Sequence, residues 1–194
     1  MGHRSRLRSV ILTTGGSEQL TDFLYDYVAL TTMMLFAVSA LSKATAFRSF
    51  KAAIRSFSLV RPAAVTPLAV AVLSSEVLVV LLLMAGGAAA VGGFILAICS
   101  LLVYTAAIST VLIRRQAVIC NCFGPSDRAV SPWDVSRNVL LIGLCVTGLP
   151  LGDALQWQLS MTLEYLLLGG GLAAVSTVLI INLRDVGRVI VRGI

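Results

Sequence analysis

Long apolar runs, separated by short polar breaks, make up most of the chain from residue 25 to residue 183. Each run is nearly free of charge and about 20 residues long, which is the length that an α-helix needs to cross the hydrocarbon core of a bilayer. The runs predict five membrane-spanning helices, at residues 25–47, 65–84, 89–113, 133–149 and 161–183. We therefore expect an all-α fold: a polytopic transmembrane helical bundle with a four-helix core and a fifth, C-terminal span.

The polar breaks set the expected domain organisation. A polar N-terminal tail covers 1–24, a transmembrane helical domain covers 25–184 and contains a Cys-x-Cys loop at 116–131, and a basic tail covers 185–194. The break after the first span holds basic residues without an acid, interleaved with apolar residues at roughly helical spacing (Phe47, Arg48, Phe50, Lys51, Ile54, Arg55, Phe57, Leu59 and Arg61). This pattern predicts a basic amphipathic helix that lies on the membrane surface.

The composition agrees with a membrane protein and argues against several function classes. Of the 194 residues, 58% are hydrophobic and 12% are charged, whereas about a quarter of the residues in a typical soluble domain are charged. The net charge of +6 comes largely from Lys and Arg at the ends of apolar runs, which indicates membrane topology and no nucleic-acid partner. The single histidine, His3, lies in the N-terminal tail, so we expect neither a histidine metal site nor a triad-type hydrolase.

The polar break after the third span contains the strongest candidate for chemistry. Cys120 and Cys122 are separated by one residue, and the following Phe123-Gly124-Pro125 predicts a turn that keeps the pair out of a helix. Because neighbouring exposed thiols exchange readily with disulfides, we expect a redox dithiol; the alternative is two unconnected loop cysteines. The other cysteines, Cys99 and Cys145, lie inside apolar runs and are expected to be small core residues.

Polar side chains inside the predicted spans are the second set of candidates. Glu76 lies near the middle of its span, where an ionised acid costs at least a few kcal/mol, so it must be protonated, paired or facing a polar interior. A neutral acid hydrogen-bonded between helices is the alternative to a functional role. Lys43, near the end of the first span, can reach back to the headgroups, and it is also the best candidate for a charged neighbour of Glu76.

The fourth span begins with a strong helix start at Ser131-Pro132-Trp133-Asp134. Arg137 and Asn138 follow within the first two turns, where Arg137 can point back toward the cysteine loop. Together with Arg114 and Arg115 before the loop and Arg128 within it, this positive charge would favour the thiolate form of the cysteines.

Five spans place residues 48–61, the cysteine loop and the C-terminal tail on the same side of the membrane. That side holds most of the basic residues that flank spans. Because short cytoplasmic loops are rich in Lys and Arg, we expect the dithiol loop to face the cytoplasm in a multi-pass protein of the cell membrane.

The segment Cys120-Asn121-Cys122-Phe123-Gly124, together with Arg137-Asn138 and Leu140, Lys43 and Glu76, resembles the MauE family of methylamine utilisation proteins, relatives of the DoxX-like membrane proteins. The resemblance implies a membrane helical bundle that works with a thioredoxin-like partner in disulfide handling, or in the maturation of an enzyme such as methylamine dehydrogenase. It also implies that Cys120 and Cys122 are the catalytic residues and that the other matching residues support them. An analogy of architecture to vitamin K epoxide reductase makes a membrane quinone the other candidate electron partner.

Three function classes stay open at this point, and a thiol-disulfide oxidoreductase is the favoured one. The second is a non-catalytic membrane assembly subunit, in which the cysteine pair is structural or holds a metal together with ligands from a partner, since two thiolates make half of a tetrahedral site. The third is a transporter or channel, motivated by Glu76 and Lys43.

Overall fold

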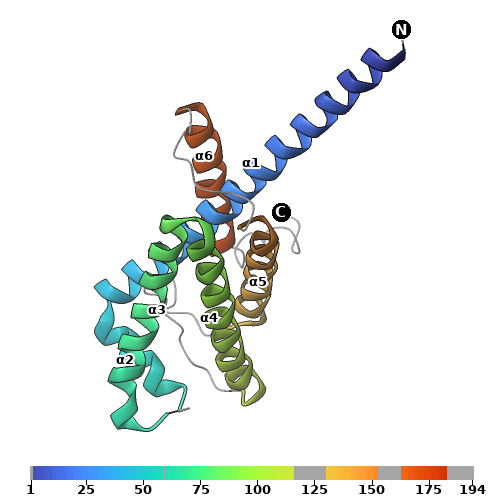
Figure 1. Cartoon of the computed structure of the whole chain (residues 1–194). Helices are drawn as coiled ribbons and strands as arrows, with labels where there is room; N and C mark the ends of the chain where they lie inside the picture. The colour runs from blue at the N-terminus through green and yellow to red at the C-terminus, as the bar shows by residue number, and fades with distance from the viewer. Residues whose placement is uncertain (1, 59, 116–129, 153–162, 183–194) are drawn as a thin grey trace.

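The computed structural model of the chain is built from α-helices (Figure 1). It describes residues 2–58, 60–115, 130–152 and 163–182. The elements in order are α1 (Gly2–Thr45), α2 (Phe47–Ser56), the short 3-10 helix η1 (Pro62–Ala64), α3 (Val65–Ala85), α4 (Gly87–Ile113), α5 (Pro132–Gly152) and α6 (Leu163–Ile181). None of these described residues forms a strand, and the predicted all-α class is confirmed.

Within the described residues, three segments are long and apolar enough to cross a membrane: Phe23–Thr45, Pro62–Ala85 and Gly87–Ile113. They correspond to the first three predicted spans. In α6 the apolar stretch Gly169–Ile181 is shorter. The four-helix core and the fifth span therefore stay predictions, whereas a polytopic membrane protein is supported.

Several predicted boundaries differ from the structure. The polar tail predicted at 1–24 is part of α1, which begins at Gly2. The fourth span was expected to end before Pro150, but α5 continues to Gly152. Pro150 has no N–H to donate, so it removes one backbone hydrogen bond near the end of α5, but the helix does not stop before it.

The α3–α4 connection is tight, because Gly86 alone separates the two helices. Gly86 has φ 70° and ψ −175°, a backbone conformation that is essentially restricted to glycine. The remaining glycines of this stretch, such as Gly92 and Gly93, lie inside α4. The tight turn leaves α3 and α4 packed side by side.

The bundle is centred on α4, which packs between α3 and α5, while α1 packs against α3, α5 and α6 (Figure 1). Its core contains an edge-to-face pair of rings, Tyr25 and Phe94, with centroids 6.2 Å apart. The outer faces of α3 and α4 carry large exposed apolar side chains such as Leu81 and Val103. Contiguous apolar surface of this kind is what a helix facing lipid presents.

The two cysteines of the apolar runs differ from each other. Cys145 on α5 is buried, as predicted, and its Sγ lies 3.8 Å from Thr32 Oγ1. Cys99 is exposed, so its predicted place in the core is wrong. The reason is that the apolar run around Cys99 has apolar residues on every side of the helix, so the sequence alone does not show which side faces the other helices.

Gly148 of α5 should tolerate alanine poorly. A Cβ there would lie 2.6 Å from the Phe94 ring, which is fully buried and held on another side by Tyr25. We expect Gly148→Ala to lower the free energy of unfolding in detergent by about 1–3 kcal/mol, the usual cost of overpacking.

Gly143→Ala is the matched control, because it lies on the same helix and a Cβ there meets nothing within 4 Å. It should be neutral or slightly stabilising, since alanine favours helices over glycine by about 1 kcal/mol. Equal melting temperatures for the two variants would show that α4 and α5 are not packed as described.

Candidate functional site

The cysteine pair itself lies outside the described residues, as do Phe123 and Gly124. The structure does describe both flanks of this segment. On one side α4 ends at Ile113 and is followed by the exposed Arg114 and Arg115. On the other side α5 begins at Pro132. Because α4 and α5 pack against each other, both flanks lie toward the same end of the bundle (Figure 1).

Each flank is closed by a defined local structure. Arg115 adopts a left-handed backbone conformation, φ 52°, and its N–H donates to the carbonyl oxygen of Leu112 at 3.1 Å, which terminates α4. At the start of α5, the Ser131 N–H donates to Asp134 Oδ2 at 2.8 Å and the Asp134 N–H donates to the Ser131 carbonyl at 3.0 Å. The helix start predicted at residues 131–134 is confirmed.

A buried ion pair lies between α1 and α3. Lys43 Nζ is 2.6 Å from Glu76 Oε1, and the two side chains are 2% and 1% exposed. The pairing suggested by the sequence is therefore present, and the alternative that Lys43 reaches back to the headgroups is wrong. Lys43 lies near the end of α1 and Glu76 near the middle of α3, and they meet because α1 crosses the other helices obliquely (Figure 1).

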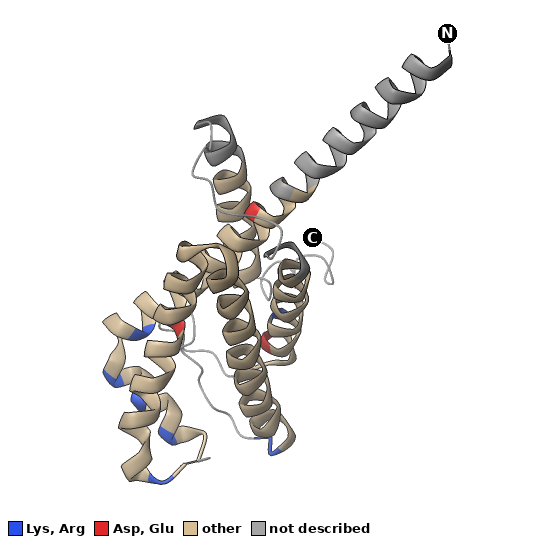
Figure 2. Cartoon of the chain, viewed as in Figure 1, with Lys and Arg blue, Asp and Glu red and all other residues tan. Residues whose placement is uncertain are grey.

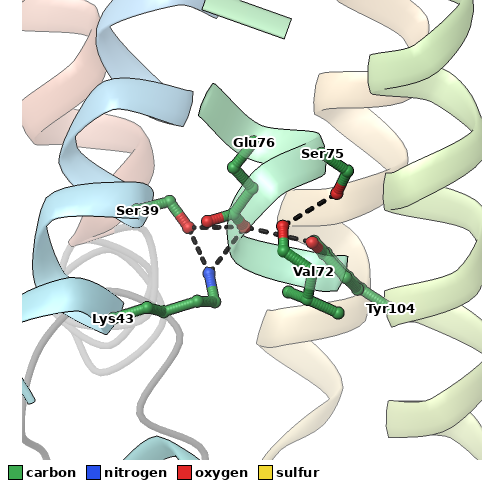
Figure 3. A network of polar contacts seen from close by, with 6 residues as sticks. All are labelled: Ser39, Lys43, Val72, Ser75, Glu76 and Tyr104. Atoms are coloured by element: carbon green, nitrogen blue, oxygen red, sulfur yellow. Dashed lines mark hydrogen bonds and ion pairs between the residues drawn. The ribbon is translucent and has the colours of Figure 1, made fainter. Parts of the chain in front are cut away.

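The Glu76 carboxylate joins three helices through one oxygen (Figure 3). Its Oε1 accepts hydrogen bonds from Ser39 Oγ at 3.0 Å, from Lys43 Nζ and from Tyr104 Oη at 3.1 Å. Lys43 Nζ also donates to Ser39 Oγ at 2.5 Å. Glu76 Oε2 has no hydrogen-bond partner among the described residues. Charge-assisted bonds in a buried site are strong, so this network fixes the relative positions of α1, α3 and α4.

Aromatic rings complete the environment of Lys43. Its Nζ lies 5.6 Å from the ring centroid of Phe50 on α2 and 5.6 Å from that of Tyr104 on α4. Both distances are within the range of a cation–π interaction, which is stronger when the cation is desolvated. The short helix α2 is thus in contact with the buried ion pair through Phe50.

Beside the ion pair lies a small cavity with a volume of about 20 Å³. This volume is enough for one ordered water. Arg137 and Asn138 of α5 are buried and line the cavity together with Lys43 and Glu76. Arg137 Nη1 also lies 3.9 Å from Asp134 Oδ1. The structure therefore brings together the four candidate residues that lie within its described part.

Sequence reasoning missed Ser39, Tyr104 and Phe50 as members of this site. Ser39 had a usable signal, because it precedes Lys43 by one helical turn and so lies on the same face of α1. Tyr104 is a polar-tipped aromatic in the middle of an apolar run, which is unusual away from the membrane interface. Phe50 gave no signal beyond its place in the amphipathic pattern.

The arrangement is a desolvated, hydrogen-bonded charge pair without an evident metal site. In the residues that the structure describes, no group of three or more His, Cys, Asp and Glu side chains could hold a metal ion. What the site can do is hold helices in fixed register and keep one carboxylate and one ammonium away from lipid.

Comparison with known proteins identifies the family. A family model described as methylamine utilisation protein MauE matches residues 21–151, about two thirds of the chain, and this range includes the cysteine pair and the whole buried network. No curated protein and no solved structure matched the chain. The match confirms the family predicted from the sequence motifs. With three described helices long and apolar enough to span a bilayer, this multi-pass membrane protein belongs to the MauE family.

Proposed function

We propose that the protein is a membrane thiol–disulfide redox protein that exchanges electrons through Cys120 and Cys122. Its electron partner would be a thioredoxin-like protein or a membrane quinone, and its role would be to support maturation of a partner enzyme of the methylamine utilisation type. The observation that carries the proposal is the place of the cysteine pair in the chain. In this MauE-family protein the pair lies in the segment that connects α4 to α5, two helices that pack against each other, and Arg114 and Arg115 lie a few residues before it in the sequence.

The proposed reaction is a two-step exchange. The thiolate of one cysteine attacks a sulfur of the partner's disulfide, which forms a mixed disulfide and releases one partner thiolate. The second cysteine then attacks the mixed disulfide, which releases the other partner thiolate and leaves Cys120 and Cys122 joined. Two electrons pass to the partner, and the protons of the two thiols end on the partner's thiols. The reverse sequence oxidises a partner dithiol.

The charges near the pair support this chemistry. Arg114 and Arg115 are exposed at the end of α4, and Figure 2 shows that Lys and Arg gather at this end of the bundle, around α2 and the end of α4. A positive potential favours the thiolate over the thiol. The supporting residues would be Lys43, Glu76, Arg137 and Asn138. They would hold in place the helices that pack next to the cysteine segment.

The test is a redox titration of the purified protein in detergent, with alkylation of Cys120 and Cys122 at each potential. A pair that interconverts between dithiol and disulfide in a defined potential range supports the proposal. Thiols that stay alkylatable at every potential would favour the other candidate, an assembly subunit without redox activity.

The dithiol segment should face the cytoplasm. If all three candidate spans cross the membrane, α2 and the end of α4 lie on one side and the start of α1 lies on the other. The side with α2 carries the basic residues that set orientation. We expect Cys120 and Cys122 to be protected from a membrane-impermeant maleimide in intact cells and to react after permeabilisation.

This labelling uses a Cys99→Ala, Cys145→Ala background, so that only the pair can react. A reporter made by Ser5→Cys in the first part of α1 is the control and should react in intact cells. If the pair is labelled in intact cells while the reporter is protected, the orientation is the opposite one and the reaction takes place in the periplasm.

A further inference from the structure

The short helix α2 has two distinct faces. Its apolar residues Phe47, Phe50 and Ile54 recur on the side that packs against α1 and α3. Phe50 is buried, at 7% exposure. On the neighbouring face Arg48 and Arg55 are exposed and Lys51 is half-buried. A helix with this division, placed between two membrane spans, is suited to the interface between lipid and water.

The positive charge of this face is not balanced nearby. From residue 44 to residue 75 the sequence contains four basic residues and no acid. These four are the three basic residues of α2 and Arg61 just before η1, and Arg114 and Arg115 follow the end of α4, where Figure 2 shows Lys and Arg at the same end of the bundle. In the described part of the chain, none of these side chains forms an ion pair. This end therefore presents a cluster of arginines and one lysine to its surroundings.

Phosphate groups match this surface in charge and in geometry. The planar guanidinium of arginine donates paired hydrogen bonds to phosphate oxygens, and each basic residue near an anionic membrane surface adds about 1 kcal/mol of attraction. Because α2 lies between two apolar spans, the phosphates within reach of it are those of bilayer lipids.

The same helix also controls the surroundings of the buried ion pair. Phe50 is the buried residue of α2, and its ring lies 5.6 Å from Lys43 Nζ. Movement of α2 away from the bundle would remove this ring and expose one side of the ammonium. A contact that holds α2 in place therefore also holds Lys43 in its desolvated site.

From these contacts we infer that α2 is a docking surface for the headgroups of anionic phospholipids, and that bound lipid holds Phe50 against Lys43. The inference does not depend on the proposed redox chemistry, since it concerns α2, α1 and the ion pair alone. It predicts two effects that can be measured separately: selection of anionic lipid, and lipid-dependent protection of Lys43.

Lipid selection is tested with the full-length protein in nanodiscs of equal parts phosphatidylcholine and phosphatidylglycerol. The protein is released from the nanodisc, and the lipids that remain bound to it are identified and counted. We expect phosphatidylglycerol to be enriched at least about fivefold, the attraction of a single basic residue. The variant Arg48→Gln, Lys51→Gln, Arg55→Gln should lose this enrichment. The control Arg4→Gln, Arg6→Gln, Arg8→Gln removes the same charge at the distant start of α1 and should keep it. Enrichment that survives the α2 variant, or that is lost equally in the control, overturns the proposal.

Protection of Lys43 is tested by acylation with an amine-reactive ester. The sequence contains two lysines, Lys43 and Lys51, so Lys51→Arg keeps the charge of α2 and leaves Lys43 as the single lysine. The Arg114→Lys substitution in this background supplies a reference amine, because residue 114 is exposed at the same end of the bundle. The ratio of the two acylation rates cancels the effect of surface charge on the reagent.

We expect vesicles with phosphatidylglycerol to slow acylation of Lys43 relative to the reference several-fold, compared with vesicles of phosphatidylcholine alone. Phe50→Ala should remove this difference. Phe47→Ala should keep it, because the Phe47 ring lies beside Lys51 and not beside Lys43. An unchanged rate ratio in the two vesicle types, or a lipid effect that survives Phe50→Ala, would show that α2 does not link lipid to the ion pair.

Discussion

Replacement of either Cys120 or Cys122 by serine should abolish thiol–disulfide exchange with a thioredoxin-like protein while leaving membrane insertion and thermal stability nearly unchanged. A hydroxyl oxygen cannot form the mixed disulfide that the exchange requires. Both cysteines lie in a polar segment of the sequence, where serine differs little in size. The measurements are the rate of reduction of the partner's disulfide and the melting temperature of each variant.

Two controls sharpen this experiment. The double variant should be no less active than either single one, because residues that act as one unit give strongly non-additive losses. Cys99→Ala changes an exposed cysteine of α4 and should retain full exchange activity. If one of the single variants keeps most of its activity, a dithiol mechanism is ruled out and the assembly-subunit alternative is favoured.

Breaking the buried ion pair should be the most destabilising change within the described helices. Lys43→Met and Glu76→Gln each leave the remaining charge buried without a counter-ion, which typically costs about 3–5 kcal/mol of folding free energy. Both substitutions remove one partner of a buried contact in which Lys43 Nζ lies 2.6 Å from Glu76 Oε1. The expected result is a large drop in melting temperature in detergent for both variants.

The double variant Lys43→Met, Glu76→Gln should be less destabilised than the sum of the single variants by about 1–3 kcal/mol, because it removes both charges together. Lys51→Met is the matched control: Lys51 is the other lysine of the chain, it is half-buried, and its Nζ lies 5.4 Å from the Phe47 ring. It should have little effect on stability. Additive losses for Lys43 and Glu76 would mean that the pair does not interact in the folded protein.

The spans that could be located from sequence are those bounded by charge and glycine. Arg61 and Gly86 bracket α3, and Gly86 and Arg114 bracket α4, so both helices were predicted to within a few residues. The start of α5 was equally clear, because Ser131 and Asp134 form a local cap that depends on neighbouring residues alone. In contrast, α1 extends to Gly2 through a stretch whose polar residues suggested a tail.

The site was predictable in its charges and unpredictable in its geometry. Glu76 and Lys43 stood out because a charge inside an apolar run must find a partner. The hydrogen bond from Tyr104 and the ring of Phe50 depend on the angles at which separate helices cross, and no local pattern encodes these angles. The cysteine segment was recognised by its motif, which needs no tertiary information.

The burial of α1 bears on the order in which the helices reach their final contacts during synthesis. Its candidate span has a mean hydropathy of 1.5, against 2.6 for the span that includes α3 and 2.3 for α4, and 56% of it is buried, against 22% and 28%. Of these three spans, the least apolar one is synthesised before the other two, so Lys43 at first lacks its carboxylate partner. The more apolar α3 follows and brings Glu76, and α4 then brings Tyr104. Of the three, the earliest span to be synthesised therefore reaches its final contacts only after the other two have followed it.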